Sequence, residues 1–355
     1  MNIEQYTFTP AVHRNKKVIL IQFEYNEQLL KAMRTRFPSA KWSRTKKAWH
    51  LPDLPVVREK IGLKHKENSK ARLKGISEHN KKCYVLMQQQ LSLKSYSNNT
   101  RRTYLAEFAH LLRLLKTKAV DDLTPKKLKD YFLYCIEEEN MGERKINGKI
   151  NAIKFYFEQV LHRQKMFFDI PRPKKKIVLP KMLSKHEVKK LITVTRNVKH
   201  SVALQLCYGM GLRVSEVVRV KLVDIDSSRM VVCITNAKGK KDRYVPLPVS
   251  LLPKLREYYK KYRPKEYLFE GQYGGLYAKS SLQQVFKNAM KKAGIKKNIG
   301  IHGLRHSYAT HLLEAGADMR FIQELLGHNS IKTTQIYTKV TPRSLSKIQS
   351  PLDTI

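Results

Sequence analysis

Acidic residues are scarce in this chain of 355 residues, which has 29 Asp and Glu against 70 Lys and Arg and a formal net charge of +41. That balance is too basic for an ordinary metabolic enzyme. At 42% hydrophobic residues, the chain is also too apolar for a disordered polycation. Because domains hold roughly 100–200 residues each, we expect two or three folded domains.

The positive charge is not confined to one tail. The net charge is +11 over residues 1–75, +11 over residues 76–182 and +19 over residues 183–355. Such a spread indicates a polyanion held by the whole molecule, most simply double-stranded DNA, whose phosphates dominate affinity through counterion release. A membrane surface is the weaker alternative, because the chain has no basic amphipathic helix that ends in a lipid anchor.

Long hydrophobic runs and cysteine pairs are also lacking. The most apolar stretch, near residues 18–21, is far shorter than the roughly 18 residues of a membrane-spanning helix, and the N-terminus has no signal-peptide pattern. The four cysteines lie far apart, with no CxxC pair and no histidine at zinc-ligand spacing. We therefore expect reduced core thiols in a cytoplasmic protein of a bacterium or phage, without metal, cofactor or membrane partner. These cysteines are Cys83, Cys135, Cys207 and Cys233.

Residues 1–57 predict a small α+β domain. The predicted elements are a strand over 17–25, a helix over 26–37 and a hairpin over 41–51. The hairpin holds the only two tryptophans of the chain, and three basic residues stand between them. Two interpretations stay open: a hairpin that contacts DNA as an arm-type domain, or two core tryptophans beside a solvated turn. The residues concerned are Trp42, Arg44, Lys46, Lys47 and Trp49.

Residues 76–165 predict a four-helix domain between two basic linkers, 58–75 and 166–182. Tyr104, Phe108 and other apolar residues recur at helical spacing after a helix start signal at Ser97. We expect the polar faces of these helices to contact phosphates. Their basic residues are Arg101, Arg102, Lys126, Lys127, Lys129, Lys145 and Lys149. The second linker, which is rich in proline, adds Lys174, Lys175 and Lys176 as further DNA contacts.

Residues 183–340 predict a third, mostly helical domain, and residues 341–355 form a tail. Ser184 with Glu187 matches a capping box at the start of a helix, and a strand pair is expected over 230–235 and 244–247. The tip of that strand pair carries Lys238. In the tail, Pro342 heads a short amphipathic segment that is too short to be a stable helix unless it docks on a surface.

Four stretches of the third domain belong together, although each alone is common. They are Gly211-Leu212-Arg213-Val214-Ser215-Glu216, the hairpin tip with Lys238, His302-Gly303-Leu304-Arg305-His306, and Leu326-Gly327-His328 with Tyr337 nine residues later. In this order they resemble the tyrosine recombinase (phage integrase) family, in its Xer-like and integrase branch. The resemblance implies six catalytic residues: Arg213, Lys238, His302, Arg305, His328 and the nucleophile Tyr337.

The chemistry of phosphodiester attack supports the same roles. Two arginines offer planar, bidentate donors to the charge that grows on two phosphate oxygens when no metal is present. A phenol of pKa about 10 is ionised only to about one part in a thousand at pH 7, so the tyrosine needs a base, and His302 is our candidate. Lys238 on its hairpin can give a proton to the leaving 5′ oxygen.

The resemblance further implies the fold and the reaction. We expect a mainly α protein with small β elements: a helical core-binding (SAM-like) domain, a mixed α/β catalytic domain and a small N-terminal domain. The expected activity is site-specific DNA recombination through a 3′-phosphotyrosyl intermediate, independent of metal and ATP. An integrase or invertase of a mobile element is the first choice and a Xer-type resolvase the second. The rivals are a type IB topoisomerase and a non-catalytic DNA-binding accessory protein.

Assembly is the last expectation from the sequence. In the resembling family, the segment after the nucleophile often docks on the neighbouring protomer. We therefore expect a largely monomeric free protein that forms a homotetramer on paired DNA sites. The alternative is a tail that docks on its own domain.

Overall fold

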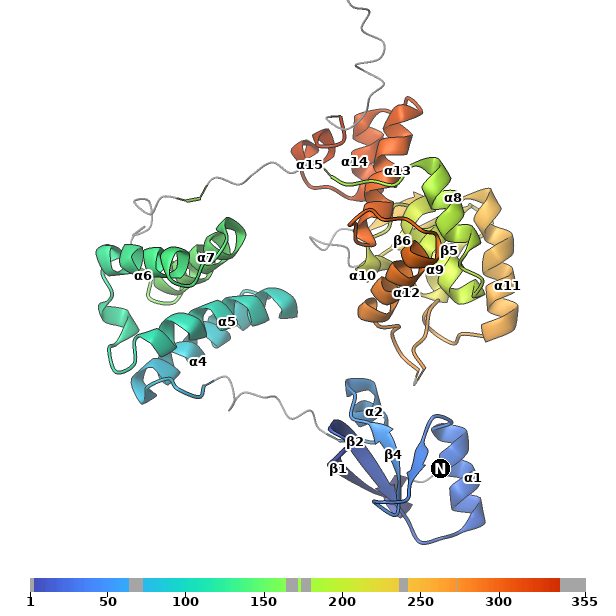
Figure 1. Cartoon of the computed structure of the whole chain (residues 1–355), viewed down its shortest axis with the longest axis horizontal. Coiled ribbons are helices and arrows are strands. Elements are labelled where there is room, and N and C mark those ends of the chain that lie inside the picture. Colours follow the sequence, from blue (N-terminus) through green and yellow to red (C-terminus); the bar gives the residue numbers. More distant parts are fainter. Residues whose placement is uncertain are drawn as a thin grey trace, which may run out of the picture. The chain divides into compact units, whose positions relative to one another are not determined.

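The computed structural model describes residues 3–63, 73–163, 172–173, 180–235, 242–272 and 274–338. Its contacts divide the chain into two compact units, one formed by Met1–His65 with Val178–Ile355 and the other by Lys66–Ile177. Figure 1 shows the helices and strands of each part of the chain. The prediction of a mainly helical protein with small sheets is confirmed.

The N-terminal part is an antiparallel sheet with strand order β1-β2-β4-β3 and two packed helices. Met33 of the helix over 27–36 and Phe37 directly after it share a core with Ile19, Ile21 and Leu51 of the sheet. The elements are η1 (Ile3–Gln5), β1 (Thr7–His13), β2 (Lys16–Gln22), α1 (Glu27–Arg36), β3 (Lys41–Ser43), β4 (Ala48–Pro52) and α2 (Pro55–Lys60). The predicted helix and hairpin are thus confirmed.

Two features of this part were not predicted. Strand β1 contains Pro10, which a sheet tolerates here because β1 is an edge strand. Helix α2 buries Val57 and Ile61 in the same core, so the core extends past residue 57, where we expected the linker to begin.

The two tryptophans of the β3–β4 hairpin have different environments. The ring of Trp49 packs against the core, with the guanidinium of Arg34 5.3 Å from its centroid. Trp42 contacts Trp49 edge to face but is 51% exposed. The turn between them presents Arg44, Lys46 and Lys47 to solvent. One tryptophan therefore serves the core, and the other lies on the surface beside the basic turn.

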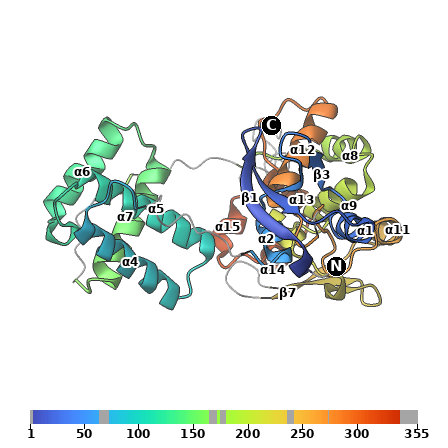
Figure 2. The same cartoon turned by 90° about the horizontal axis from the view of Figure 1, so that it is seen from below.

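The helical unit contains the four predicted helices. They are α4 (Glu78–Leu93), α5 (Asn98–Leu114), α6 (Pro125–Glu137) and α7 (Glu143–Gln159), with the short η2 (Val120–Asp122) between α5 and α6. Helix α5 packs against α4 and α7, and α6 packs against α7 (Figures 1 and 2). Ser77, Ser97 and Thr124 accept hydrogen bonds from backbone N–H groups at the starts of α4, α5 and α6.

Lys149 corrects the predicted polar face of the last helix. Its side chain is fully buried, its Nζ lies 3.0 Å from a Glu107 carboxylate oxygen, and it donates to the Tyr131 hydroxyl at 3.2 Å. Helix α7 contacts both α5 and α6, so its buried surface is wider than the apolar stripe suggests. Lys149 is therefore a core residue and not a phosphate contact.

The C-terminal part surrounds helix α9, which is apolar on several sides because it packs against α8, α11, α12 and α13. A three-stranded antiparallel sheet, β5-β6-β7, includes the predicted strand pair. The strands are β5 (Ile225–Asp226), β6 (Val231–Ile234) and β7 (Arg243–Pro246). The helices are α8 (Lys185–Thr193), α9 (Val198–Gly209), α10 (Val214–Val217), η3 (Leu222–Asp224), η4 (Val249–Leu251), α11 (Leu252–Tyr262), α12 (Lys279–Lys292), α13 (His302–Glu314), α14 (Met319–Leu326) and α15 (Ile331–Gln335).

Further local predictions can be compared with this part. The capping box of α8 is confirmed, because Ser184 Oγ accepts from Glu187 N and the Glu187 carboxylate accepts from Ser184 N. The cysteines are unpaired as predicted, although Cys233 is only partly buried while the other three are core residues. None of the described helices combines the length and the apolar character needed to cross a bilayer.

Candidate active site

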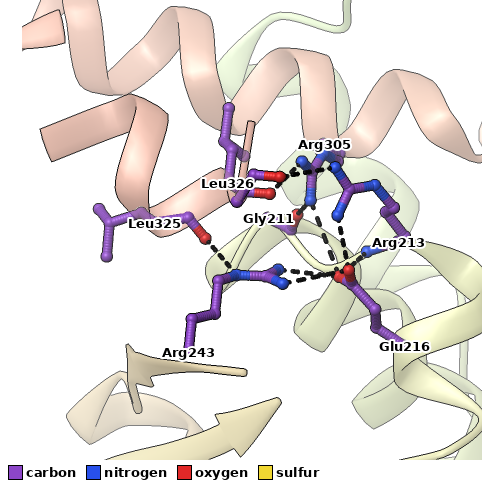
Figure 3. A network of polar contacts seen from close by, with 8 residues as sticks. Gly211, Arg213, Glu216, Arg243, Arg305, Leu325 and Leu326 are labelled. Atoms are coloured by element: carbon purple, nitrogen blue, oxygen red, sulfur yellow. Dashed lines mark hydrogen bonds and ion pairs between the residues drawn. The ribbon is translucent and has the colours of Figure 1, made fainter. Parts of the chain in front are cut away.

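Three guanidinium groups converge on one buried carboxylate, that of Glu216 in α10 (Figure 3). Arg213 donates to it at 2.7 Å, and Arg243 from β7 donates at 2.9 Å. Arg305 from α13 forms a longer ion pair at 3.8 Å. Burial by itself raises the pKa of Glu216. The opposing effects are larger and lower the pKa overall: the hydrogen bond and the charge of Arg243, and the hydrogen bonds from Arg213. The carboxylate is ionised, and the cluster keeps an excess of positive charge that suits an anion.

The carbonyl groups at the end of α14 hold the same arginines. Leu325 O accepts from Arg243 at 2.9 Å, Leu326 O accepts from Arg305, and Gly327 O accepts from Arg213 at 3.2 Å. The last carbonyls of a helix lack partners within the helix and carry the negative end of its dipole, so they favour cations. The helix end thus fixes the direction of all three guanidinium groups.

Two glycines make this arrangement sterically feasible. Gly327 ends α14 with a φ of +61°. Gly211 also has a φ of +61°, and its carbonyl accepts from Arg305 at 2.7 Å. A Cβ atom at Gly211 would lie 2.4 Å from the ring of Tyr308. The glycines of the GLR and LGH motifs are therefore required by left-handed backbone and close packing.

Arg305 is the most enclosed of the three arginines, with only 1% of its surface exposed. Burial, followed by the charge of Arg213, lowers the pKa of Arg305 to about 9, so the guanidinium stays protonated at neutral pH. Its Nε is buried and has no hydrogen-bond partner among the described residues. An unpaired buried donor costs about 1–3 kcal/mol, so this nitrogen is a ready site for an acceptor oxygen.

Three histidines adjoin the arginines. His302 is exposed at the start of α13, and His306 lies one turn later with the ring centroids 4.7 Å apart. His328 follows Gly327, and its Nδ1 is 3.0 Å from the Thr334 hydroxyl. Burial, and then neighbouring cations, lowers all three pKa values, to about 4 for His306 and His328. Those two rings are therefore uncharged at neutral pH.

Tyr337 lies in the turn after α15 and is only 3% exposed. Its ring packs against Ala309, Ile322 and Leu326, and its phenol oxygen lies 3.0 Å from His306 Nδ1. Burial raises the pKa of Tyr337, whereas the positive charges of the two nearby arginines of the motif lower it, with a net increase. The phenol is therefore protonated and needs a partner that can take its proton.

The structure brings together five of the six residues predicted to be catalytic. They are Arg213, His302, Arg305, His328 and Tyr337. Lys238 lies outside the described residues. Sequence reasoning missed three residues of the cluster: Glu216, Arg243 and His306. Glu216 and His306 are part of the motifs already singled out, whereas Arg243 has no local signal beyond its place near the basic hairpin tip.

A cleft of about 770 Å³ adjoins the cluster between α10, α12 and the start of α13. Its lining includes Arg213, Lys279, Gln283, Lys287 and His302. Cationic and amide side chains on its walls are typical of a surface that binds phosphates and polar base edges.

Among the described residues of the helical unit, metal-ligand side chains gather in two groups: His79 with Cys83 and Asp121, and His110 with Cys135 and Glu139. The spacing of His79 and Cys83, four residues apart on α4, corrects the expectation that no histidine stands at ligand spacing from a cysteine. Burial raises the pKa of both thiols. Hydrogen bonds account for both groups: Asp121 accepts from Tyr156, and His110 pairs with Glu139.

The residues predicted to contact DNA outside the active site are spread over the chain. Arg101 and Arg102 lie in the first turns of α5, where Arg102 is exposed and donates to Asn99 at 3.1 Å. The basic run 174–176 lies outside the described residues.

Known proteins resemble this chain over both its helical and its C-terminal parts. Residues 181–343 match the phage integrase family, and residues 83–165 match the phage integrase N-terminal SAM-like domain. A putative integrase/recombinase, y4qK of Sinorhizobium fredii, is 38% identical over 269 residues, which cover 75% of this chain and 87% of that protein. The tyrosine recombinase XerA of Pyrococcus horikoshii is 36% identical over 260 residues, 72% of this chain and 88% of that protein.

Solved structures share the fold. A lambda integrase (residues 75–356 of that protein) dimer bound to a COC′ core site superposes with a TM-score of 0.62 at 18% identity. The match covers 76% of this chain and 98% of that one.

Proposed function

Because the chain belongs to the phage integrase family of tyrosine recombinases, we propose that it cuts and rejoins DNA strands at specific sites, with Tyr337 as the nucleophile. The observation that carries this proposal is the uncompensated positive charge beside a buried phenol. Arg213, Arg243 and Arg305 share one carboxylate, and the charges of Arg213 and Arg305 act on Tyr337. Such a site favours the negative charge that develops on phosphorus oxygens and on the attacking phenol.

The reaction uses the arginines as the phosphate clamp. Arg213 and Arg305 donate to the two non-bridging oxygens, and the unpaired Nε of Arg305 is a donor for one of them. His302 was predicted as the base, but it is exposed in the cleft beside Arg213, which favours a contact with the phosphate instead. Lys238 remains our proposed acid for the leaving 5′ oxygen. The resulting 3′-phosphotyrosyl bond retains the energy needed for religation.

Access to the nucleophile requires a conformational change. Tyr337 and Arg305 are almost completely buried. A phosphate of a DNA duplex therefore reaches them only if the segment after His328 moves. We propose that DNA binding shifts this segment, so that cleavage is coupled to correct seating of the duplex.

Double-stranded DNA is the partner that the chemistry of the surface favours. The cleft with Lys279, Gln283 and Lys287 lies next to the phosphate clamp. The basic turn at 44–47 and the start of α5 are further exposed cationic segments in other parts of the chain. We propose that residues 1–75 bind a second DNA sequence outside the crossover site. Deleting them is expected to preserve cleavage of a short core site and to shorten footprints on a long site at its flanks. An unchanged footprint would contradict this role.

The biological role follows less directly from the chemistry. Integration or inversion of a mobile element is the first candidate, supported by the relative named as an integrase/recombinase. Resolution of chromosome dimers is the second, because XerA-type relatives are almost as similar. Sequencing the DNA that the protein captures covalently in its host distinguishes them: mobile-element ends support the first role, and a single chromosomal site supports the second.

Assembly is proposed to follow the expectation from the sequence. The protein is largely monomeric when free and forms a homotetramer on paired sites, with the tail 341–355 docked on a neighbouring protomer. Deleting the tail should weaken cooperative binding to full sites more than binding to half-sites. Equal losses in gel-shift titrations on both would place the tail on its own subunit.

The test of the proposed activity is covalent capture of DNA. Wild-type protein should form an adduct with a nicked duplex that carries the site, and Tyr337→Phe should bind the same duplex without forming one. Excess EDTA should not change the yield, because the clamp is built from guanidinium groups. An adduct of unchanged yield with Tyr337→Phe would overturn the assignment.

A further inference from the structure

We propose that His306 is the base that accepts the phenol proton of Tyr337 during strand cleavage, an inference that rests on the proposed recombinase function. His306 Nδ1 lies 3.0 Å from the Tyr337 oxygen, within the range for direct proton transfer. His306 is held by the second turn of α13 and Tyr337 by its buried ring, and the proposal requires that their contact persists when the segment after His328 shifts on DNA binding.

The other two histidines of the site are placed differently. His302 is exposed at the start of α13, and its ring contacts that of His306. His328 pairs its Nδ1 with the Thr334 hydroxyl, and its ring lies nearly parallel to that of Tyr337 at an interplanar angle of 17°. His306, in contrast, has a ring nitrogen at hydrogen-bond distance, 3.0 Å, from the phenol oxygen of Tyr337.

The groups around His306 keep its ring neutral. His302 and Arg305 face it from the same helix, His328 approaches from the loop after α14, and Tyr337 closes the remaining side. None of these groups is a carboxylate that would favour a charged imidazole. Burial, followed by His302 and Arg305, lowers the pKa of His306 to about 4. At neutral pH one ring nitrogen is consequently free to accept a proton.

The proton transfers balance in both directions. As the Tyr337 oxygen bonds to phosphorus, the bond from phosphorus to the 5′ oxygen breaks. The phenol proton passes to His306 Nδ1, and the 5′ oxygen takes a proton from Lys238, the proposed acid. Religation reverses both transfers. The surrounding cations make the imidazolium a strong enough acid to return its proton to the departing phenolate.

The pH dependence of single-turnover cleavage tests this role, with full-length protein and a nicked duplex that carries the site captured by the wild type. The wild-type rate should be constant from about pH 6 to 8, because His306 is deprotonated and Arg305, whose pKa is lowered to about 9, is still mostly protonated over this range. His306→Asn keeps a polar group near Nδ1 but removes the base. It should be slower by about 10²–10⁴ at pH 7. Its rate should rise about tenfold per pH unit, because attack then depends on the small phenolate fraction.

The chain offers a matched control on the same helix. His311 is buried, and its Nδ1 lies 2.9 Å from the hydroxyl of Tyr208. His311→Asn removes the same kind of His–Tyr contact outside the active site. It should keep the wild-type rate and the flat pH profile, while thermal unfolding reports any loss of stability in both variants.

Two results would overturn the proposal. One is a His306→Asn variant with the wild-type pH profile, which would make His306 a positioning residue only. The other is the same steep profile in His311→Asn. If His306→Asn fails to fold, His306→Ala with added imidazole replaces it, and recovery of cleavage supports the base whereas no recovery contradicts it. Adduct formation by the wild type tests the proposed function separately.

Discussion

Buried charge is arranged in opposite ways in the helical unit and in the C-terminal part of the chain. In the helical unit each buried cation or histidine has its own carboxylate. Lys149 pairs with Glu107 at 3.0 Å, His110 pairs with Glu139 at 3.0 Å, and the Tyr131 hydroxyl lies between Lys149 and His110. Each of these charges thus faces an opposite charge, as expected where buried polar groups serve the fold, although Glu139 Oε2 is buried without a hydrogen-bond partner in the part of the chain that the structure describes.

The C-terminal cluster is not balanced in this way. Arg213, Arg243 and Arg305 share Glu216, and helix-end carbonyls supply the rest of their hydrogen bonds. Dipoles orient the guanidinium groups without cancelling their charge. The difference between the two regions teaches that burial of charge does not by itself identify a site for an anion. An excess of buried positive charge distinguishes such a site from a polar core.

The largest expected effect concerns the clamp. Arg213→Lys and Arg305→Lys each remove planar donors, and we expect cleavage to slow by about 10²–10³, or about 3–4 kcal/mol. DNA affinity should change far less, because contacts are distributed over a chain of net charge +41. Single-turnover rates and gel-shift affinities measured side by side check this.

Proportional losses of rate and affinity in either variant would mean that the arginine only positions DNA. The excess positive charge of the arginine cluster would then serve DNA binding and not catalysis.

A somewhat smaller effect, on the free energy of unfolding, is expected when the ion pair of Lys149 with Glu107 in the helical unit is broken. Lys149→Met should lower the free energy of unfolding by about 3 kcal/mol, because it leaves Glu107 without its partner in the core. Cleavage by the folded fraction should stay at the wild-type level. On the same helix, Lys154→Met removes an ion pair of Glu158 that is partly exposed, and it should cost less than about 1 kcal/mol. Urea unfolding compares the two, and equal losses would contradict the core role of Lys149.

The smallest effect concerns pH. The pKa values of His306 and His328 are lowered to about 4 in the folded protein, whereas an unfolded histidine titrates near about 6.5. Between these values the unfolded chain binds more protons, so stability should fall as pH drops from 6.5 towards 4. Between pH 6.5 and 5 we expect a loss of about 1–2 kcal/mol per histidine. His328→Gln should flatten this slope in urea unfolding between pH 5 and 6.5, and an unchanged slope would exclude His328 as a source.

The sequence predicted the residues of the site better than the contacts between them. The resemblance of four short motifs, taken in order, to the tyrosine recombinase family pointed to Arg213, His302, Arg305, His328 and Tyr337. Helix α1 and the capping box of α8 were predictable because caps act within a few residues.

Contacts between distant residues were not predictable from the sequence. Arg243 reaches Glu216 across 27 positions, and His306 reaches Tyr337 across 31 positions. No local pattern encodes such pairs, because they arise only when α10, β7, α13 and the turn after α15 pack together. The prediction that Lys149 lies on a polar face was wrong for a related reason, since the burial of its side chain depends on which helices pack against α7.

The central claim is that Tyr337 attacks DNA within this cationic cluster, and mass spectrometry of the trapped complex tests it most directly. Wild-type protein is captured on a nicked duplex that carries the site, the DNA is digested to a short remnant, and the protein is cleaved with trypsin. We predict the nucleotide mass on the peptide 333–339, at Tyr337. A nucleotide on any other residue, or an adduct that persists in Tyr337→Phe, would contradict the account.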